Sequence, residues 1–364
     1  MTISKLTIVP EQLHSAVPGG IGVYTREILK SAAGPLTSSI RSIEIYGSTW
    51  TGSGDDPFLE FGIPIRSAKG NNRYVTRWWD IAPSFAKVDG GTLLSLSMAG
   101  PISSNAERSI FAIYDLAFRH VPEVFTSRGR RWHEKRLGMI QRSGSEVITL
   151  SDESATDLID AGFNKDQVHV VSPGSDHLPY PDFERAEQLL AESDVRTPFL
   201  LVVGTLEPRK NLKRIFDAID QARPLLGGEF PVVVVGPDGW GNKDGERKGV
   251  IFVGKVTDRV LNALYQRASL LVYAPLFEGF GLPPLEAMAA ALPVVASKIP
   301  STDEQVATIV DPYDVDSISD GIVKVLTNES TRSRLVREGL LRSNELTWRY
   351  SGQRLVEVVT GLRK

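Results

Sequence analysis

The sequence predicts an α/β fold built on parallel sheets, and two observations carry that prediction. Residues 270–297 contain a strand-like run (LLVYAP), a turn rich in glycine and proline, an alanine-rich helical run and a second strand-like run (PVVAS). This is the order of a βαβ unit whose loop lies at the carboxyl end of a strand. The length of 364 residues suits two domains of roughly 150 to 200 residues each.

The composition is that of an ordinary globular protein. It is 41% hydrophobic and 23% charged with a net charge of −3, so no global charge attracts nucleic acid or an anionic surface. The absence of cysteine excludes disulfides, cysteine-ligated zinc and thiol chemistry. No stretch reaches the ~20 apolar residues of a spanning helix, and the amino terminus lacks a signal-peptide pattern. We therefore expect a cytoplasmic protein and leave peripheral membrane contact open.

The first half of the chain alternates strand-like and helical runs. Lys5–Pro10 is predicted to be the first strand, and Gly19 and Gly20 lie in a loop that opens a helix. Further strands are predicted within Ser109–Phe118 and Glu146–Ser151. The pair Trp78–Trp79 has two interpretations, the wall of an acceptor site or, as is more usual for tryptophan, buried packing.

A basic segment, Arg128–Arg142, stands out in this half. It carries six cations against the single acid Glu134, and on a helix they would form a ridge beside Trp132. One interpretation is a solvated helix face, which most charge runs are. The other is a docking surface for an anionic acceptor or lipid head groups.

The second half repeats the α/β pattern after a charged stretch, 179–196, that reads as a linker with a short helix. Phe199–Val203 is predicted to be a strand, and Asn211 occupies the N-cap position of the helix that follows. Between them, Arg209 and Lys210 could balance a diphosphate without a metal. The alternative is a helix-entry loop with solvated charges.

Two carboxylates, Glu278 and Glu286, bracket the glycine-rich turn of the βαβ unit. Amides from Leu285 onward would face an anion, while a carboxylate could bond ligand hydroxyls, a combination that suits a nucleotide sugar. For a bare pair of glutamates, an ordinary helix entry with a favourable first-turn acid is the alternative.

The full segment EGFGLPPLEAMA, with seven residues between its two glutamates, resembles the signature motif of retaining glycosyltransferases of family 4. The segment PRKNL at 208–212 resembles a second motif of the same family. The resemblance covers the second domain and, more loosely, the first. It implies the GT-B architecture, two facing Rossmann-like domains with an inter-domain cleft. Residues 1–178 would form the acceptor side, 197–350 the nucleotide-sugar domain and 179–196 the linker, with the last helix, 351–364, packing back on the first domain.

The resemblance also implies a reaction and roles for residues. A hexose would move from a nucleotide diphosphate sugar to an acceptor hydroxyl in a glycan, polysaccharide or lipid-linked acceptor, with retention of anomeric configuration and with neither a metal nor a cofactor. Glu278, Arg209 and Lys210 form the implied catalytic set, and Glu286 holds the ribose. The rest of the implied donor site comprises Gly19, Gly20, Gly204, Lys255, Val256, Gly279, Phe280, Gly281 and Leu282.

One departure from the family pattern concerns the sugar side of the site. The family often has His-Asp where this chain has Tyr114-Asp115, and tyrosine cannot carry a charge near neutral pH. His120 could compensate, or it could be a surface residue. A catalytically impaired nucleotide-sugar-binding or assembly subunit is therefore an alternative function. A dinucleotide oxidoreductase is disfavoured because no GxGxxG lies between a strand and a helix with an acid about 20 residues on.

Two sequence segments bear on which nucleotide sugar is the donor. PRKNL with the segment GPDGW at 236–240 most resembles mannosyltransferases that use GDP-mannose, and a UDP-sugar is the alternative. The expected partners are thus a nucleotide sugar and a glycan or lipid-linked acceptor, with no nucleic acid. Peripheral contact at the inner face of the membrane would run through Arg128–Arg142.

Overall fold

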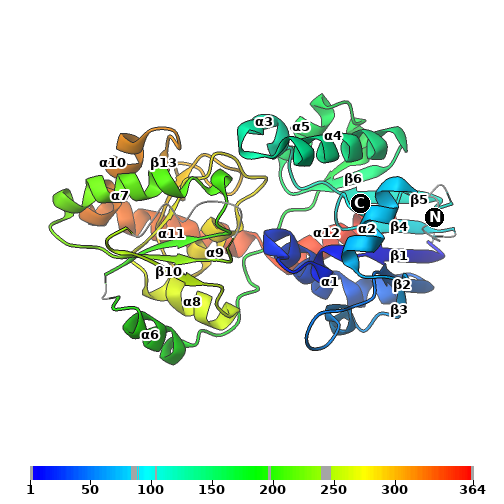
Figure 1. Ribbon diagram of the computed structural model, residues 1–364, viewed down its shortest axis with the longest axis horizontal. Helices are drawn as coiled ribbons and strands as arrows, with labels where there is room; N and C mark the ends of the chain where they lie inside the picture. Colours follow the sequence, from blue (N-terminus) through cyan, green and yellow to red (C-terminus); the bar gives the residue numbers. More distant parts are fainter. Residues whose placement is uncertain are drawn as a thin grey trace. The chain divides into compact units, whose positions relative to one another are not determined.

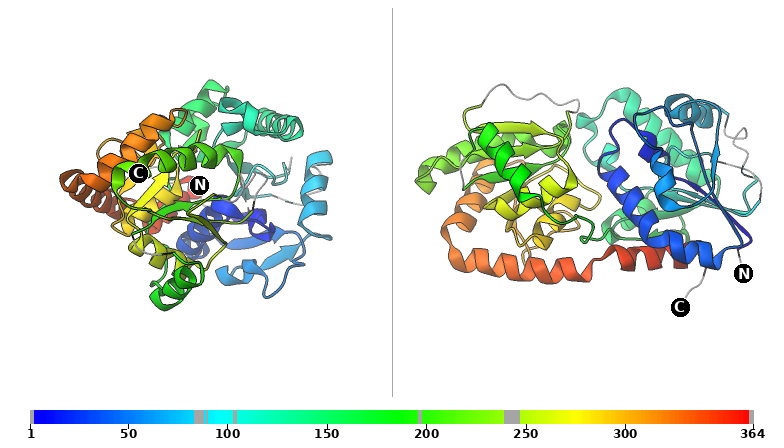
Figure 2. Two further views of the ribbon diagram at one scale, coloured as in Figure 1. Left: turned by 60° about the vertical axis from the view of Figure 1, so that its left-hand side comes forward. Right: turned by 90° about the horizontal axis from the view of Figure 1, so that it is seen from below.

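The computed structural model describes residues 3–82, 88, 90–102, 105–195, 198–238 and 247–361. It divides into two compact units, the first formed by Met1–Gly174 with Trp348–Lys364 and the second by Ser175–Thr347. Each unit is a parallel sheet with helices on both faces (Figures 1 and 2). The predicted α/β class is therefore confirmed for both halves of the chain.

The first unit contains a sheet with the strand order β3-β2-β1-β4-β5-β6-β7, in which every neighbouring pair is parallel. Helices α1 and α12 cover one face and α4 and α5 the other (Figure 1). Strand β4 is buried along its whole length, as a strand between two helical layers should be. The elements are β1 (Lys5–Val9), α1 (Gly19–Ser39), β2 (Ser42–Gly47), β3 (Ile65–Ser67), α2 (Asn72–Ile81), β4 (Thr92–Ser95), β5 (Arg108–Ala112), α3 (Ala117–His120), α4 (Ser127–Arg142), β6 (Glu146–Thr149), α5 (Asp152–Asp160), β7 (Val168–Val170) and α12 (Trp348–Thr360).

Helix α12 belongs to the first unit although it ends the chain, and it runs beside α1 in both views (Figures 1 and 2). Ser31 Oγ donates a hydrogen bond to Trp348 O at 2.6 Å. A Cβ on Gly352 would lie 2.2 Å from Ser31 Oγ, so the close helix contact needs glycine there. The Arg108 guanidinium donates to the carbonyl of Val359 at 2.7 Å, near the carboxyl end of α12. The helix begins three residues before the predicted start at 351, and residues 362–364 lie outside the described residues.

The second unit contains a sheet with the order β10-β9-β8-β11-β12-β13, again with every neighbouring pair parallel. Helices α7 and α10 lie on one face and α8 and α9 on the other (Figure 1). Strand β9 is a run of four valines, all buried, because β-branched side chains suit a strand covered on both faces. The elements are α6 (Phe183–Glu192), β8 (Leu200–Val203), α7 (Leu212–Leu226), β9 (Val232–Val235), β10 (Val250–Gly254), α8 (Asp258–Arg267), β11 (Leu270–Tyr273), α9 (Leu282–Ala289), β12 (Val294–Ser297), β13 (Thr308–Val310), α10 (Val315–Thr327) and α11 (Glu329–Glu345).

The stretch 179–196, expected to be a linker, is instead part of the second unit as far as it is described, and the chain passes between units at 174–175. Its short helix is α6, which buries Ala186 and Leu190 and packs on α8. Asn262 Nδ2 donates to Pro179 O at 2.8 Å. The charge of this stretch lies on the exposed face of an amphipathic helix, which is why composition alone suggested a linker.

Two local expectations in the first unit also need correction. Helix α1 begins at Gly19, so Gly19 and Gly20 form its first turn and not a loop before it. The tryptophan pair is split: Trp79 is buried against Tyr46, whereas Trp78 is 57% exposed. Adjacent residues on a helix point in different directions, so one burial environment could not hold both.

Within the part of the chain that the structure describes, no helix has the length and apolar character needed to cross a membrane.

Candidate active site

The candidate site of the second unit lies where the order of its strands reverses. Strands β8 and β11 are direct neighbours, and successive connections lead away from them in opposite directions. The loops that follow these two strands, 204–211 and 274–281, therefore meet at one edge of the sheet. Ligands of open α/β sheets bind at such a reversal, at the carboxyl ends of the strands.

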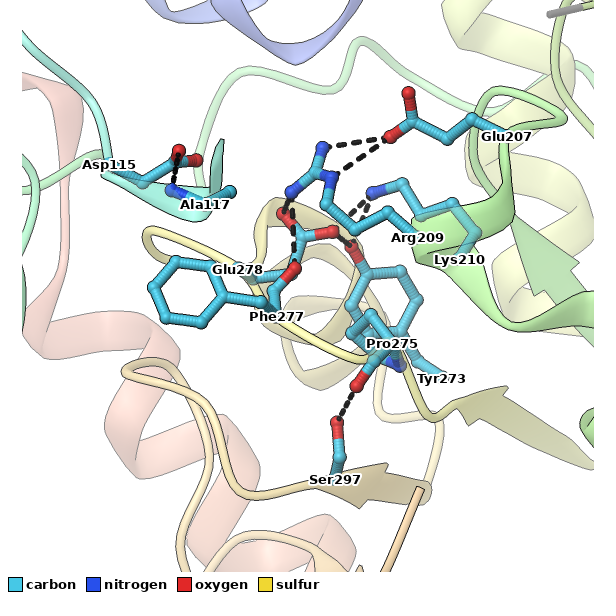
Figure 3. Close-up of polar contacts among 10 residues, drawn as sticks. All are labelled: Asp115, Ala117, Glu207, Arg209, Lys210, Tyr273, Pro275, Phe277, Glu278 and Ser297. Carbon is cyan, nitrogen blue, oxygen red and sulfur yellow. Dashed lines mark hydrogen bonds and ion pairs between the residues drawn. The ribbon is translucent and has the colours of Figure 1, made fainter. Parts of the chain in front are cut away.

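Ion pairs join the two loops: two cations of the loop after β8 contact Glu278, which lies in the loop after β11 (Figure 3). Arg209 Nη1 lies 3.0 Å from Glu278 Oε2, and Lys210 Nζ lies 2.6 Å from Glu278 Oε1. The Glu278 side chain is only 10% exposed. The three residues of the predicted catalytic set are thus in direct contact, although almost 70 residues of chain separate the glutamate from the two cations.

Further groups fix the geometry of this cluster (Figure 3). Arg209 donates to Glu207 Oε1 through both Nε and Nη2, at 3.1 and 2.8 Å, and Arg209 Nη1 donates to Phe277 O at 3.1 Å. Lys210 Nζ donates to the Tyr273 hydroxyl at 2.8 Å, and that hydroxyl donates to Glu278 Oε1 at 3.0 Å. A phenol that accepts from the cation and donates to the carboxylate holds both in one orientation.

Burial and neighbouring charges shift the pKa values of two acidic groups in the cluster, Glu278 and Tyr273. Burial by itself would raise the pKa of Glu278, but Arg209 and Lys210 outweigh burial and hold that pKa at about 2, below the ordinary value of 4.5. Burial and the negative charge of Glu278 together raise the pKa of Tyr273 well above 10. At neutral pH the cluster therefore contains a carboxylate, two cations and a neutral phenol.

The glycine-rich turn is shaped by its own packing as well as by any ligand. Gly281 has φ +97°, and a Cβ there would lie 2.4 Å from Ile299 Cδ1, so glycine is required for two reasons. The ring of Phe280 is buried. Leu282 begins α9, and the two prolines that follow it lie in the first turn of this helix, where a missing N–H costs no hydrogen bond. Because proline has no N–H, the donors at this helix start are those of Leu282 and Leu285. Gly279 lies in the same glycine-rich turn, directly after Glu278.

Glu286 lies on α9 and has partners of its own. Tyr265 OH, from α8, donates to Glu286 Oε2 at 2.7 Å, and His177 Nε2 lies 3.2 Å from Glu286 Oε1. Burial, followed by the charge of Glu286, raises the pKa of Tyr265 well above 10. The two glutamates of the sequence signature thus enter two separate networks. One contains cations, and the other contains a phenol and an imidazole.

Asn211 occupies the predicted N-cap position but does not cap α7 with its side chain. Its backbone is left-handed (φ 61°), which asparagine tolerates. The side-chain Nδ2 instead donates to Ala274 O at 3.0 Å and Pro312 O at 2.6 Å. Asn211 therefore connects the Arg209–Lys210 loop to the loop after β11, which is a positioning role that the local pattern did not predict.

The remaining donor-side residues lie at neighbouring strand ends. Gly204 follows β8, where its φ of +151° and the Lys210 side chain, 3.2 Å from a Cβ, leave little room for a larger residue. Lys255 and Val256 follow β10, with Lys255 exposed. Of the segment GPDGW at 236–240, residues 239–240 lie outside the described residues.

The three predicted sugar-side residues of the first unit each have a partner within the protein. Tyr114 OH donates to Leu96 O at 2.7 Å, and burial raises the pKa of Tyr114 well above 10. Asp115 Oδ1 accepts from Ala117 N at 2.9 Å and so orders the start of α3 (Figure 3). His120 Nε2 lies 2.7 Å from Asp157 Oδ2 on the surface, where α3 ends.

The basic segment forms α4, but it is not a uniform ridge. Arg136 is fully buried, Trp132 donates its indole N–H to Asp80 Oδ2 at 2.7 Å, and Arg119 pairs with Glu134. The exposed cations of the segment are Arg128, Arg130, Arg131, Lys135 and Arg142. Arg136 and Trp132 therefore do not take part in an exposed basic ridge, because Arg136 is buried and Trp132 is bonded to Asp80.

Four residues that complete the two networks were not predicted: Glu207, Tyr273, Tyr265 and His177. A tyrosine at the carboxyl end of an otherwise aliphatic strand (LLVY) was the one available signal, because buried phenols need a partner. Over the described ranges, no group of three or more His, Asp or Glu side chains is placed to hold a metal ion.

Comparison with known proteins identifies the class. Residues 186–342 match the family model described as glycosyl transferases group 1. The O-antigen chain mannosyltransferase B of Escherichia coli is 31% identical over 257 residues, which cover 66% of this chain and 67% of that protein. The chain therefore belongs to this family and is a glycosyltransferase.

Other relatives differ in length or share only the fold. The serotype-specific mannosyltransferase WbdA of Escherichia coli is 28% identical over 253 residues, 64% of this chain, and the match spans about a third of WbdA, 31% of its length. The crystal structure of Anabaena HepE with UDP and glucose has a TM-score of 0.74 at 19% identity, covering 99% of this chain and 100% of that one. WaaG, a glycosyltransferase involved in lipopolysaccharide biosynthesis, has a TM-score of 0.70 at 17% identity, covering 98% of this chain and 100% of that one. These likenesses confirm the predicted GT-B fold.

Proposed function

We propose that this glycosyltransferase moves a hexose from a nucleotide diphosphate sugar to an acceptor hydroxyl with retention of anomeric configuration. The observation that carries the proposal is the cluster of Arg209, Lys210 and Glu278 at the strand-order reversal of the second unit. Two cations held by neighbouring acids and a phenol are suited to a diphosphate, because they are already oriented before the ligand arrives.

The proposed chemistry assigns each charged group a task. Arg209 and Lys210 stabilise the negative charge that grows on the diphosphate as the bond from the sugar C1 to the phosphate oxygen breaks. Glu278 lies beside the sugar and Glu286 bonds the ribose hydroxyls. The acceptor oxygen bonds to C1 on the face that the diphosphate leaves, and its proton passes to a phosphate oxygen, so that no protein base is needed.

For the donor we propose GDP-mannose. The support is that the relatives O-antigen chain mannosyltransferase B and WbdA are named as mannosyltransferases. A UDP-sugar is the second candidate, because HepE was crystallised with UDP and glucose. Binding without turnover is the third, because the Tyr114 hydroxyl donates a hydrogen bond to the Leu96 carbonyl and Tyr114 stands where the family often has histidine. We further propose a glycan or lipid-linked acceptor, reached from the inner face of the membrane.

A binding panel tests the donor. GDP, UDP, GDP-mannose and UDP-glucose are compared by calorimetry and by thermal shift, where a ligand at 100 times its dissociation constant adds about 2.7 kcal/mol of stability. We expect GDP and GDP-mannose to bind and Arg209→Ala/Lys210→Ala to lose both. The matched control is Lys213→Ala/Arg332→Ala, which removes two exposed cations. Equal binding by wild type and the Arg209/Lys210 variant contradicts the assignment.

Turnover is tested separately. Donor hydrolysis or transfer above background rejects the non-catalytic alternative, and proton NMR of the first-formed product reports its anomeric configuration. A product of inverted configuration would contradict the retaining mechanism.

A further inference from the structure

The two cations assigned to the diphosphate are paired with acids of the protein itself (Figure 3). Arg209 lies 2.8 Å from Glu207 Oε1 and 3.0 Å from Glu278 Oε2. Lys210 lies 2.6 Å from Glu278 Oε1. The Glu207 and Glu278 side chains are only 8% and 10% exposed, so solvent ions screen these pairs little. Two carboxylates therefore balance two cations at a site proposed for a strongly negative ligand.

Glu278 contacts the cations at the nitrogens that a diphosphate would bond. Its Oε2 faces Arg209 Nη1, and its Oε1 faces Lys210 Nζ. A phosphate oxygen bonded to either nitrogen at ~3 Å would lie within about 6 Å of a Glu278 oxygen, because both oxygens share that nitrogen as a partner. Glu207 differs, since it accepts from Arg209 through other nitrogens, Nε and Nη2.

A diphosphate at these two cations is opposed by Glu278 in either of two arrangements. If the phosphate oxygens replace the carboxylate, a buried acid loses its ion pairs, which is strongly unfavourable. If the carboxylate keeps its ion pairs, like charges face each other across a poorly screened site. A free nucleoside diphosphate bears this cost in full, because it brings no group that can donate a hydrogen bond to Glu278 in exchange.

A nucleotide sugar can offset the same cost. In the proposed function the sugar lies beside Glu278, and its hydroxyls can donate hydrogen bonds to the carboxylate. Hydrogen bonds to an ionised acceptor are roughly twice as strong as neutral ones. The sugar therefore compensates Glu278 for the cations that the diphosphate engages, and this compensation ends when the sugar has been transferred.

We propose that Glu278 is an internal counter-ion that makes the site favour the nucleotide sugar over the nucleoside diphosphate that remains after transfer. The proposal rests on the proposed glycosyl transfer and gives Glu278 a further task, the discrimination of donor from product. Once the sugar has left, the carboxylate competes with the diphosphate for Arg209 and Lys210 and so promotes release of the product.

Calorimetry with matched ligand pairs tests this inference. The pairs are GDP with GDP-mannose and UDP with UDP-glucose. The quantity compared is the dissociation constant of the nucleoside diphosphate divided by that of the nucleotide sugar. Glu278→Gln removes the charge and keeps the size of the side chain. The matched control is Glu207→Gln, which removes a similarly buried acid from the other nitrogens of Arg209. Hydrogen exchange of the β9 amides verifies that the second unit of each variant is folded.

For the pair that binds, we expect wild type to hold the nucleotide sugar about tenfold more tightly than the nucleoside diphosphate, a difference of ~1.4 kcal/mol. Glu278→Gln should bind the nucleoside diphosphate more tightly than wild type does and should lower the ratio about tenfold. Glu207→Gln should change both affinities alike, because Glu207 lies on the far nitrogens of Arg209, and should leave the ratio within about threefold of wild type.

Three results would overturn the inference. The first is wild type binding the nucleoside diphosphate at least as tightly as the nucleotide sugar, a comparison that holds even if Glu278→Gln does not fold. The second is a Glu278→Gln variant that binds the nucleoside diphosphate no more tightly than wild type, which would show that Glu278 only orients the cations. The third is an equal fall of the ratio in the two variants. Each of these leaves the proposed function intact as long as wild type binds the nucleotide sugar, whereas failure of every ligand to bind wild type rejects both.

Discussion

Replacing Glu278 with glutamine should destabilise the second unit in a manner that depends on pH. The pKa of Glu278 is about 2 in the folded protein and 4.5 ordinarily. This pKa difference of about 2.5, at ~1.4 kcal/mol for each pH unit, corresponds to about 3–4 kcal/mol of stability at neutral pH. The substitution also leaves Lys210 without its carboxylate, and breaking a buried ion pair typically costs ~3–5 kcal/mol. We therefore expect a loss of about 3–5 kcal/mol.

The sign of the pH dependence follows from the lowered pKa. Because the folded state holds the carboxylate ionised, its contribution is fully present above pH 4.5 and is lost as the pH falls towards 2. The difference in unfolding free energy between wild type and Glu278→Gln should therefore be constant near neutral pH and shrink below pH 4.5.

Hydrogen exchange resolved by segment measures this effect where it occurs. The amides of β9 report opening of the second unit, and those of β4 report the first unit as an internal reference. The matched control is Glu187→Gln, which removes an acid from an exposed pair with Arg267 and should cost no more than ~1 kcal/mol. Equal protection of β9 in the two variants at pH 7 would refute the reasoning.

Three further predictions concern the nucleotide, the glycine turn and the basic helix. Glu286→Gln should weaken both free nucleoside diphosphate and nucleotide sugar in calorimetry, whereas Glu278→Gln should not weaken the free nucleotide; wild-type binding of both ligands by both variants would show that the roles are wrong. Gly281→Ala should lower the free energy of unfolding by about 2–5 kcal/mol, of which the left-handed backbone accounts for ~1–2 kcal/mol and contact with Ile299 for ~1–3 kcal/mol. The control Gly254→Ala, where φ is +69° and no atom lies within 4 Å, should cost about 1–2 kcal/mol, and equal losses of the two variants in urea unfolding would show that the contact with Ile299 contributes nothing. If Arg128, Arg130 and Arg131 dock on anionic lipid at ~1 kcal/mol each, co-sedimentation with anionic vesicles should decrease as salt is added and vanish when all three are replaced by glutamate. Negligible binding to both anionic and neutral vesicles would instead show that this side of α4 is only a solvated face.

Local patterns in the sequence were enough to place most elements and the two loops of the site. The strand-like runs Lys5–Pro10, LLVYAP and PVVAS, and the turn rich in glycine and proline before α9, are short-range features, and each gave the right element. Such features are predictable because backbone preference and hydrophobic period act over a few residues. The family signature then predicted which loops carry chemistry.

Interactions between distant segments were decided only by the tertiary structure. Asn211 was expected to cap its helix, but its side chain bonds the loop after β11, because β8 and β11 are neighbours in the sheet. The same neighbourhood places Tyr273 between Lys210 and Glu278, and helix packing gives Glu286 its partners Tyr265 and His177. In the first unit, packing buried Arg136 and joined Trp132 to Asp80. The sequence by itself determined which residue types line these loops, whereas their partners, burial and pKa values depend on strand order and helix packing, which bring together groups that are far apart along the chain.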